Sequence, residues 1–354
     1  MLVRLRSDLA ESDLRTLLRL AEELGYRANF LDQDRRLLEL DGVGAPDHRS
    51  RLEDCFAVER ILDVGTAREL HERTPERDAT VVRVGDAMFG GGHVSLIAGP
   101  CAIEERKRTI EIACEVRARG AALLRGGAYK PRTSPYSFQG TRRAGLAMLA
   151  EARAESGLGV VTEALDPRDV EAVAEVADMI QVGARNMANQ PLLTELGRLR
   201  KPVLLKRGFM ATLREFLLAA EFVLAGGNDQ VVLCERGIRS FDGATRNVLD
   251  VGGVAWLKLH THLPVLVDPS HAAGRADLVR PLARAGLAAG ADGLICEVHP
   301  RPHEVRSDAA QALGLEDFSA VVRDARALVA LDGRTLVQPA RSPATRDPKR
   351  TPTL

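Results

Sequence analysis

An alternation of short apolar runs with amphipathic stretches dominates the chain from about residue 80 onward. Eight times, an apolar run ends in a polar or glycine-containing loop, and a stretch with helical periodicity follows. The runs are SLIAGPC, AALLRGG, GVVTEAL, DMIQVGAR, PVLLKRG, QVVLCERG, LPVLVDPSH and GLICEVHP. Continuous apolar strands that alternate with helices are typical of a parallel sheet covered on both faces. Eight such units within roughly 235 residues predict an α/β fold of the (β/α)8 or TIM-barrel type.

A doubly wound open sheet is the main alternative to the barrel. The first βα turn of a dinucleotide-binding sheet carries the pattern GxGxxG. No such pattern follows the first apolar run of this chain. The barrel is therefore the favoured prediction.

The first 66 residues predict a separate small domain. A strand (MLVRLR), a helix (ESDLRTLLRLAEELG), two strands (RANFLDQD and LLELDGV), a short helix (HRSRLEDCFA) and a last strand (VERILDVG) follow one another. This βαββαβ order is that of a ferredoxin-like domain. Residues 67–79 predict a charged linker. Residues 80–334 then form the barrel unit, which begins with a hairpin (TVVRVGDAMFGGGHV). Residues 335–354 are rich in Pro, Arg and Thr without apolar periodicity, which predicts a disordered tail.

Charge and cysteine content limit the partners that we expect. Lys and Arg together number 49, as do Asp and Glu, so no bulk field attracts nucleic acid or an anionic membrane. The five cysteines include no CxxC pair, which favours a reduced cytoplasmic protein. There is neither an apolar signal core nor a membrane-length apolar run. We therefore expect a soluble cytoplasmic protein that captures anions by a local cluster of cations.

Cationic side chains follow several of the eight runs. Because the carboxyl ends of barrel strands meet at one mouth, these side chains should converge there. Each alone could be a solvated surface cation, but together they predict a pocket for a multiply charged anion such as phosphate. The five are Arg125, Lys130, Arg185, Lys206 and Arg236.

A second group at the same mouth combines sulfur, nitrogen and oxygen donors. Its members are Cys101, His271, Glu297 and Asp308. A mixed donor set of this kind suits a divalent first-row metal such as Mn²⁺, Fe²⁺, Co²⁺ or Zn²⁺. No sequence spacing links the four residues, so each also has an ordinary structural explanation, such as a buried cysteine or an exposed carboxylate.

Seven motifs of the barrel region resemble one known enzyme family. They are AGPC, LLRGGAYKPRTSPYSFQG, QVGARNMANQ, PVLLKRGFM, LCERGIRSF, LVDPSHAAGR and EVHPRPHEVRSD. The family is 3-deoxy-D-arabino-heptulosonate 7-phosphate (DAHP) synthase, in the subtype related to 3-deoxy-D-manno-octulosonate 8-phosphate (KDO8P) synthase. The resemblance covers about residues 80–334. By layout, the small domain resembles the ACT-like regulatory domain of some members.

The resemblance implies a reaction and a role for each matching residue. The family condenses phosphoenolpyruvate with erythrose 4-phosphate, the first step of the shikimate route to aromatic amino acids. The resemblance implies that Arg132 and Thr133 bind the phosphate of erythrose 4-phosphate. Lys130 is the candidate general acid, with a metal-bound water as the rival donor, and Glu163 is a candidate for orienting the attacking water. The five cations named above match the phosphoenolpyruvate pocket, and Cys101, His271, Glu297 and Asp308 match the metal ligands.

Three other functions remain open from the sequence. KDO8P synthase would use arabinose 5-phosphate, but the KPRTS loop at residues 130–134 favours erythrose 4-phosphate, because the KDO8P family follows the lysine with Ala-Asn-Arg-Ser. A Schiff-base aldolase would use Lys206. A non-catalytic amino-acid sensor is disfavoured because the donor set is complete.

The resemblance also implies regulation and assembly. End-product control would use tyrosine or phenylalanine bound by residues 1–66, with the polar segment HERTPERDA, residues 71–79, as a hinge. Family members are commonly homotetramers.

Overall fold

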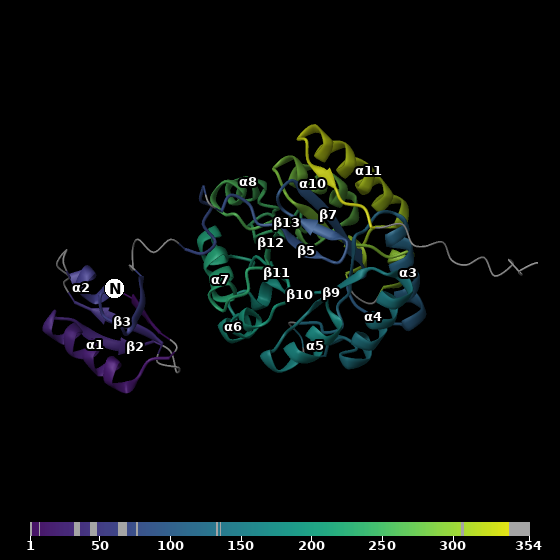
Figure 1. The fold of residues 1–354 in the computed structure, drawn as a ribbon. Coiled ribbons are helices and arrows are strands. Elements are labelled where there is room, and N and C mark those ends of the chain that lie inside the picture. The colour runs from purple at the N-terminus through teal and green to yellow at the C-terminus, as the bar shows by residue number, and fades with distance from the viewer. Residues whose placement is uncertain are drawn as a thin grey trace, which may run out of the picture. The chain divides into compact units, whose positions relative to one another are not determined.

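The chain divides into two compact units, Met1–Glu69 and Leu70–Leu354 (Figure 1). The computed structural model describes residues 2–6, 8–31, 36–42, 48–62, 69–75, 77–131, 134, 136–305 and 308–339. No helix in this described part of the chain has the length and hydrophobicity that a membrane span needs.

The first unit is a four-stranded antiparallel sheet with two helices. Its sheet order is β2-β3-β1-β4, which is the order of a ferredoxin-like domain. Helix α1 buries Leu14, Leu17 and Ala21, which lie at helical spacing, in a core with sheet residues such as Val3 and Leu38. The elements are β1 (Leu2–Leu5), α1 (Glu11–Glu23), β2 (Arg27–Phe30), β3 (Leu37–Asp41), α2 (His48–Glu53) and β4 (Val58–Leu62). The predicted βαββαβ fold is confirmed.

The second unit contains a closed barrel of eight parallel strands. Each strand pairs with the next, and β14 pairs with β7 to close the ring. The predicted (β/α)8 barrel is therefore confirmed. The strands are β7 (His93–Gly99), β8 (Leu123–Arg125), β9 (Gly159–Glu163), β10 (Met179–Val182), β11 (Val203–Lys206), β12 (Val231–Glu235), β13 (Val265–Val267) and β14 (Gly293–Glu297).

Helices cover the outside of this barrel. They are α3 (Arg106–Ala118), α4 (Arg143–Ser156), α5 (Val170–Val176), α6 (Gln190–Arg198), α7 (Leu213–Ala225), α8 (Val251–His260), α10 (Ala276–Ala288) and α11 (Leu315–Leu331). Short helical turns at the strand ends are η1 (Pro167–Asp169), η2 (Ala184–Asn186), α9 (Pro269–Ala273), η3 (Pro302–Glu304) and η4 (Ala309–Gln311).

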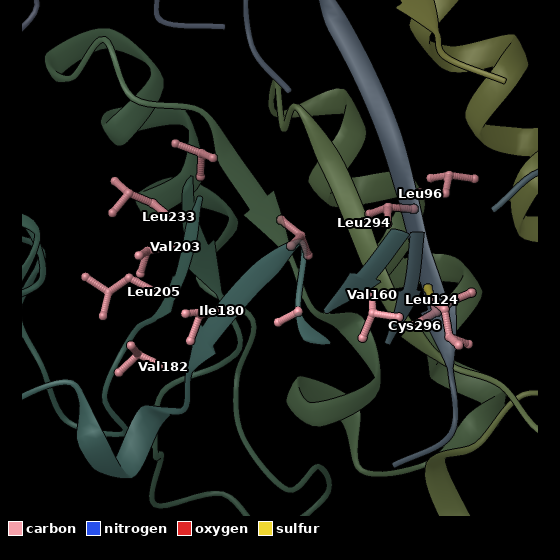
Figure 2. Close-up of a cluster of buried hydrophobic side chains, with 14 of the residues drawn as sticks. Leu96, Leu124, Val160, Ile180, Val182, Val203, Leu205, Leu233, Leu294 and Cys296 are labelled. Carbon is pink, nitrogen blue, oxygen red and sulfur yellow. The ribbon is translucent and has the colours of Figure 1, made fainter. Parts of the chain in front are cut away.

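Successive residues of the barrel strands enter different cores, because side chains alternate between the two faces of a strand. Leu96 and Leu294 belong to the large cluster between strands and helices, part of which Figure 2 shows. Their neighbours Ile97 and Ile295 belong to a second cluster inside the barrel. This alternation explains why the strands read as continuous apolar runs.

A hairpin closes the end of the barrel at which the strands begin. It is formed by β5 (Val82–Val84) and β6 (Ala87–Phe89), whose apolar side chains join the cluster inside the barrel. The backbone N–H of Met88 donates a hydrogen bond of 3.0 Å to Ser95 Oγ, near the start of β7. The opposite end, where the strands finish, is left for the functional site.

The segment predicted as a free linker and hinge packs on the barrel instead. His71 is 4% exposed, and its Nδ1 lies 2.7 Å from Glu221 Oε1 on α7. Glu72 forms an antiparallel bridge with Thr261. The hinge prediction is therefore wrong for residues 71–73, which bind the barrel at Glu221, Thr261 and His260, whereas residues 75 and 77–79 are exposed.

The prediction that a disordered tail begins at residue 335 is also wrong at its boundary. Strand β15 (Thr335–Leu336) pairs in parallel with β7 at His93 and Val94. Val337, beyond this strand, is buried. The barrel unit therefore continues past residue 334, and residues 340–354 lie outside the described residues.

Candidate active site

A pocket opens at the carboxyl ends of the barrel strands. Four of the five predicted cations line it, namely Lys130, Arg185, Lys206 and Arg236. Arg125 lies at the end of β8, is 4% exposed, and has its Nη2 3.3 Å from Glu297 Oε1. The barrel thus brings five cations from four strand-loop units to one mouth, as parallel strands with equivalent ends require.

An aromatic ring organises part of this cationic cluster. The Cζ atoms of Arg185, Arg236 and Arg239 lie 5.2, 4.7 and 5.4 Å from the centre of the Phe209 ring. The negative face of an aromatic ring attracts guanidinium groups, which offsets part of their mutual repulsion. Phe209 and Arg246 also line the pocket, and neither was predicted from the sequence. The available signal for Phe209 was its place three residues after Lys206 in the same loop.

The predicted metal donors converge beside these cations. Donor atoms of Cys101, His271 and Glu297 all lie within 4.8 Å of one another. Cys101 Sγ donates a hydrogen bond of 2.9 Å to Asp308 Oδ2. Asp308 itself has a positive φ of 60°, an uncommon conformation outside glycine. All four predicted ligands are therefore neighbours, although Cys101 and Asp308 are 207 positions apart in the sequence.

The carboxylate of Glu297 is arranged as a ligand for a cation. Its Oε2 accepts a hydrogen bond of 2.7 Å from Gln311 Nε2. Its Oε1 is buried and receives no hydrogen bond from the described residues, although His271 Nε2 lies 3.1 Å away. Arg125 Nη2 also lies 3.3 Å from this oxygen, but a buried carboxylate oxygen that receives no hydrogen bond is costly. Because that oxygen lies with a thiol and an imidazole, the site fits a divalent metal.

The second nitrogen of His271 fixes the orientation of its ring. His271 Nδ1 lies 2.7 Å from Asp268 Oδ2, and Lys206 Nζ forms an ion pair with the same carboxylate. Burial opposes ionisation of Asp268, but the neighbouring His271 and Lys206 hold its pKa well below the usual value. An ionised Asp268 accepts a hydrogen bond from Nδ1–H of His271, which directs the Nε2 lone pair toward the donor cluster. This carboxylate–histidine arrangement is typical of metal sites.

The ionisation of the three clustered donors differs. Burial, with a smaller contribution from Glu297, raises the pKa of the Cys101 thiol to about 12. Burial lowers the pKa of His271. Burial disfavours the Glu297 carboxylate, but His271 and Arg125 more than compensate and lower its pKa. In the metal-free protein the donor set is therefore a thiol, a neutral imidazole and a carboxylate.

The two predicted acid–base residues line the same pocket. Lys130 Nζ donates hydrogen bonds to Cys101 O at 3.0 Å and Cys101 Sγ at 2.9 Å. Burial raises the pKa of Glu163, whose Oε2 accepts a hydrogen bond of 3.2 Å from Gln181 Nε2. Glu163 Oε1 receives none from the described residues. A Cβ atom at Gly183 would lie 2.1 Å from that oxygen, so glycine leaves room for it.

The predicted erythrose 4-phosphate residues, Arg132 and Thr133, lie outside the described residues. Pro131, directly before them, lines the pocket.

These features define a class of protein, a TIM-barrel enzyme with an anion pocket next to a mixed-donor metal site. The chain matches the family model described as the DAHP synthetase I family over residues 68–330. The chain therefore belongs to the DAHP synthetase I family.

Individual relatives agree with this family. The phospho-2-dehydro-3-deoxyheptonate aldolase of Thermotoga maritima is 45% identical over 329 residues, which are 93% of this chain and 97% of that protein. The crystal structure of this DAHP synthase superposes with a TM-score of 0.75 at 44% identity, covering 95% of this chain and 98% of that one. A 2-dehydro-3-deoxyphosphooctonate aldolase of Syntrophotalea carbinolica is 34% identical, covering 71% of this chain and 96% of its own. The predicted resemblance to DAHP synthase is confirmed, and the KDO8P synthases are more distant relatives.

Proposed function

We propose that this pocket condenses phosphoenolpyruvate with D-erythrose 4-phosphate and water to give DAHP and phosphate. The observation that carries the proposal is the convergence of buried cations beside a cysteine, a histidine and a glutamate at one barrel mouth, in a chain of this family. The cations match a substrate that bears both a phosphate and a carboxylate. The donor cluster matches a reaction in which negative charge develops on an aldehyde oxygen.

The bond changes follow from the two substrates. Carbon 3 of phosphoenolpyruvate forms the new bond to the aldehyde carbon, and the aldehyde oxygen takes up a proton. Water adds to carbon 2, and the tetrahedral centre then loses phosphate by C–O cleavage. Arg185, Lys206 and Arg236 stabilise the phosphate oxygens, while Arg132 and Thr133 bind the phosphate of the aldose.

Two residues move or hold protons in this proposal. Lys130 donates to the nascent alkoxide, because its ammonium group lines the pocket and already contacts Cys101. Glu163 orients the attacking water with its unpartnered Oε1. Cys101, His271, Glu297 and Asp308 hold a divalent ion, chosen from Mn²⁺, Fe²⁺, Co²⁺ and Zn²⁺, which supplies Lewis-acid polarisation of the aldehyde when bound.

One assay tests the reaction and its nearest alternative. Phosphate release from phosphoenolpyruvate is measured with erythrose 4-phosphate and with arabinose 5-phosphate, with and without chelator and with each metal restored. We expect release that depends on metal, with kcat/KM far higher for erythrose 4-phosphate. Similar values for the two aldoses would refute the argument from the KPRTS loop.

A Schiff-base mechanism on Lys206 is disfavoured by its ion pair with Asp268. A lysine that attacks a carbonyl needs an available Nζ lone pair, whereas Lys206 Nζ donates a hydrogen bond to Asp268. Borohydride treatment in the presence of substrate should leave activity and mass unchanged after dialysis.

We further propose that residues 1–66 form a regulatory domain that binds tyrosine or phenylalanine and lowers turnover. The unit has its own hydrophobic core, and the described pocket residues all belong to the other unit. Deletion of residues 1–66 should preserve catalysis and abolish inhibition. If the intact enzyme ignores aromatic amino acids at millimolar levels, the domain has a tethering or stabilising role instead.

We also propose a cytoplasmic homotetramer, as the family resemblance implies. Light scattering of the purified protein measures its mass in solution. A monomer at micromolar concentration would contradict the proposed assembly.

A further inference from the structure

A buried ion-pair cluster lies at the ends of β11 and β12. Arg207 Nη1 donates hydrogen bonds to Glu235 Oε2 at 2.9 Å and to Asp250 Oδ2 at 2.8 Å. Arg207 Nε donates to the carbonyl oxygen of Ala211 at 2.9 Å. Arg207 and Glu235 are 4% and 0% exposed. Removing such charges from water costs free energy that their attraction barely offsets, so stability alone does not explain the cluster.

Two members of this cluster, Arg207 and Glu235, are sequence neighbours of cations that line the pocket. Arg207 follows Lys206 directly, and Glu235 directly precedes Arg236. Lys206 lies opposite Cys234 in the ladder, and Arg207 N continues the ladder to Cys234 O at 3.0 Å. Because side chains alternate along a strand, Lys206 and Arg236 enter the pocket while Arg207 and Glu235 point to the other face.

Glu235 also fixes the turn that follows Arg236. Its Oε1 accepts a hydrogen bond of 2.6 Å from Gly237 N. Gly237 has a φ of +91°, and a Cβ atom there would lie 2.7 Å from Asn247 Cβ and 2.9 Å from Ala272 Cα. The carboxylate therefore holds one strand end through its backbone and the other through the Arg207 guanidinium.

We propose that the Arg207–Glu235 pair positions Lys206 and Arg236 for the phosphoenolpyruvate phosphate. Each of these two pocket cations leaves the backbone next to a residue of the buried pair. A rigid backbone at these two positions reduces the ordering that binding must impose. This role rests on the proposed function for its substrate, and neither Arg207 nor Glu235 touches the pocket.

The Glu235→Gln substitution separates positioning from simple electrostatics. Removing a negative charge near an anion pocket should, by Coulomb's law alone, tighten phosphate binding. Loss of the Arg207–Glu235 ion pair should make the two strand ends more mobile, which should weaken phosphate binding. The two effects have opposite signs, so the direction of the change discriminates between them.

Matched variants complete the design. Asp250→Asn removes the other carboxylate bound to the same Arg207 nitrogen, and asparagine keeps the cap of α8. Arg207→Lys keeps the charge but loses the planar fork that reaches three acceptors. Arg334→Lys is the control for a general loss of stability, since Arg334 binds the carbonyl oxygens of Ala291 and Leu287 at the other end of the barrel.

The experiment is titration calorimetry of phosphoenolpyruvate into each intact enzyme, with KM for both substrates and circular dichroism as a folding check. We expect Glu235→Gln and Arg207→Lys to weaken phosphoenolpyruvate binding about tenfold and to change KM for erythrose 4-phosphate less than twofold. Asp250→Asn and Arg334→Lys should bind within about threefold of wild type. If the Glu235→Gln enzyme does not fold, phosphoenolpyruvate binding by the Arg207→Lys enzyme alone tests the positioning role.

Unchanged or tighter binding in the folded Glu235→Gln or Arg207→Lys enzyme overturns the proposal. If Asp250→Asn loses as much phosphoenolpyruvate affinity as Glu235→Gln, the specific role of Glu235 is overturned. A wild-type enzyme that binds phosphoenolpyruvate but does not condense it with erythrose 4-phosphate refutes the proposed function, while the binding data still test the positioning role.

Discussion

Metal binding at the barrel mouth should strengthen about tenfold for each unit of pH between 7 and 8.5. The reason lies in Cys101, whose thiol has a pKa raised to about 12 by burial and by Glu297. A cysteine binds metal as the thiolate, so the metal must displace this proton. At pH 7 the five-unit gap corresponds to about 7 kcal/mol that metal coordination has to supply.

The other donors should add little to this pH dependence. The pKa of His271 is lowered, so the imidazole is already neutral in this range. The pKa of Glu297 is also lowered, so its carboxylate is already ionised. One proton therefore leaves for each ion bound, and the slope of log K against pH is about one.

Chelator competition at pH 7.0, 7.5, 8.0 and 8.5 measures the slope, after correction for protonation of the chelator. Calorimetry in buffers of different ionisation enthalpy counts the released protons independently. Cys101→Ala is the control, because it should bind more weakly and without the slope. An affinity independent of pH in the wild type would mean that the thiolate exists before metal arrives, or that Cys101 is not a ligand.

Three further substitutions test separate parts of the site. Cys101→Ala should abolish turnover while changing the melting temperature by less than about 4 °C, as thermal unfolding followed by circular dichroism can show; full activity in metal-free buffer would contradict the metal site. Asp268→Asn should reduce metal affinity by about 10- to 100-fold, because it removes the carboxylate that orients His271, and chelator competition measures the loss. Phe209→Leu should raise KM for phosphoenolpyruvate about three- to tenfold with little effect on kcat. The reason is that each guanidinium–ring contact contributes on the order of 0.5–2 kcal/mol. Unchanged steady-state kinetics would show that the ring is not needed for phosphoenolpyruvate binding.

The barrel was predictable because its signal is local and repeated. Each strand is buried on both faces, so its apolar run is uninterrupted and its ends are marked by polar residues. The segment around His71 was not predictable in the same way. Its polar residues read as a solvated linker, and only the fold reveals that Glu221, 150 positions away, binds the imidazole.

The site was predictable where a residue directly ends a strand. Lys206 and Glu297 are the last residues of β11 and β14, so their position follows from the strand pattern. Arg246 and Phe209 lie within loops, whose paths depend on tertiary packing rather than on periodicity. The buried Arg207 was missed for another reason, since a charged residue beside a functional one reads as part of the same solvated loop.

The cations around the mouth of the barrel differ in whether a carboxylate is already paired with them. Two cations that line the pocket are paired with carboxylates, Lys206 with Asp268 and Arg246 with Asp308. Arg185 and Arg236, which follow β10 and β12, face Phe209, and neither has an ion-pair partner among the described residues. An anion therefore gains more from Arg185 and Arg236 than from Lys206, whose charge Asp268 already offsets. We infer that, of the three cations proposed to bind the phosphate of phosphoenolpyruvate, Arg185 and Arg236 contribute the larger part of the binding free energy.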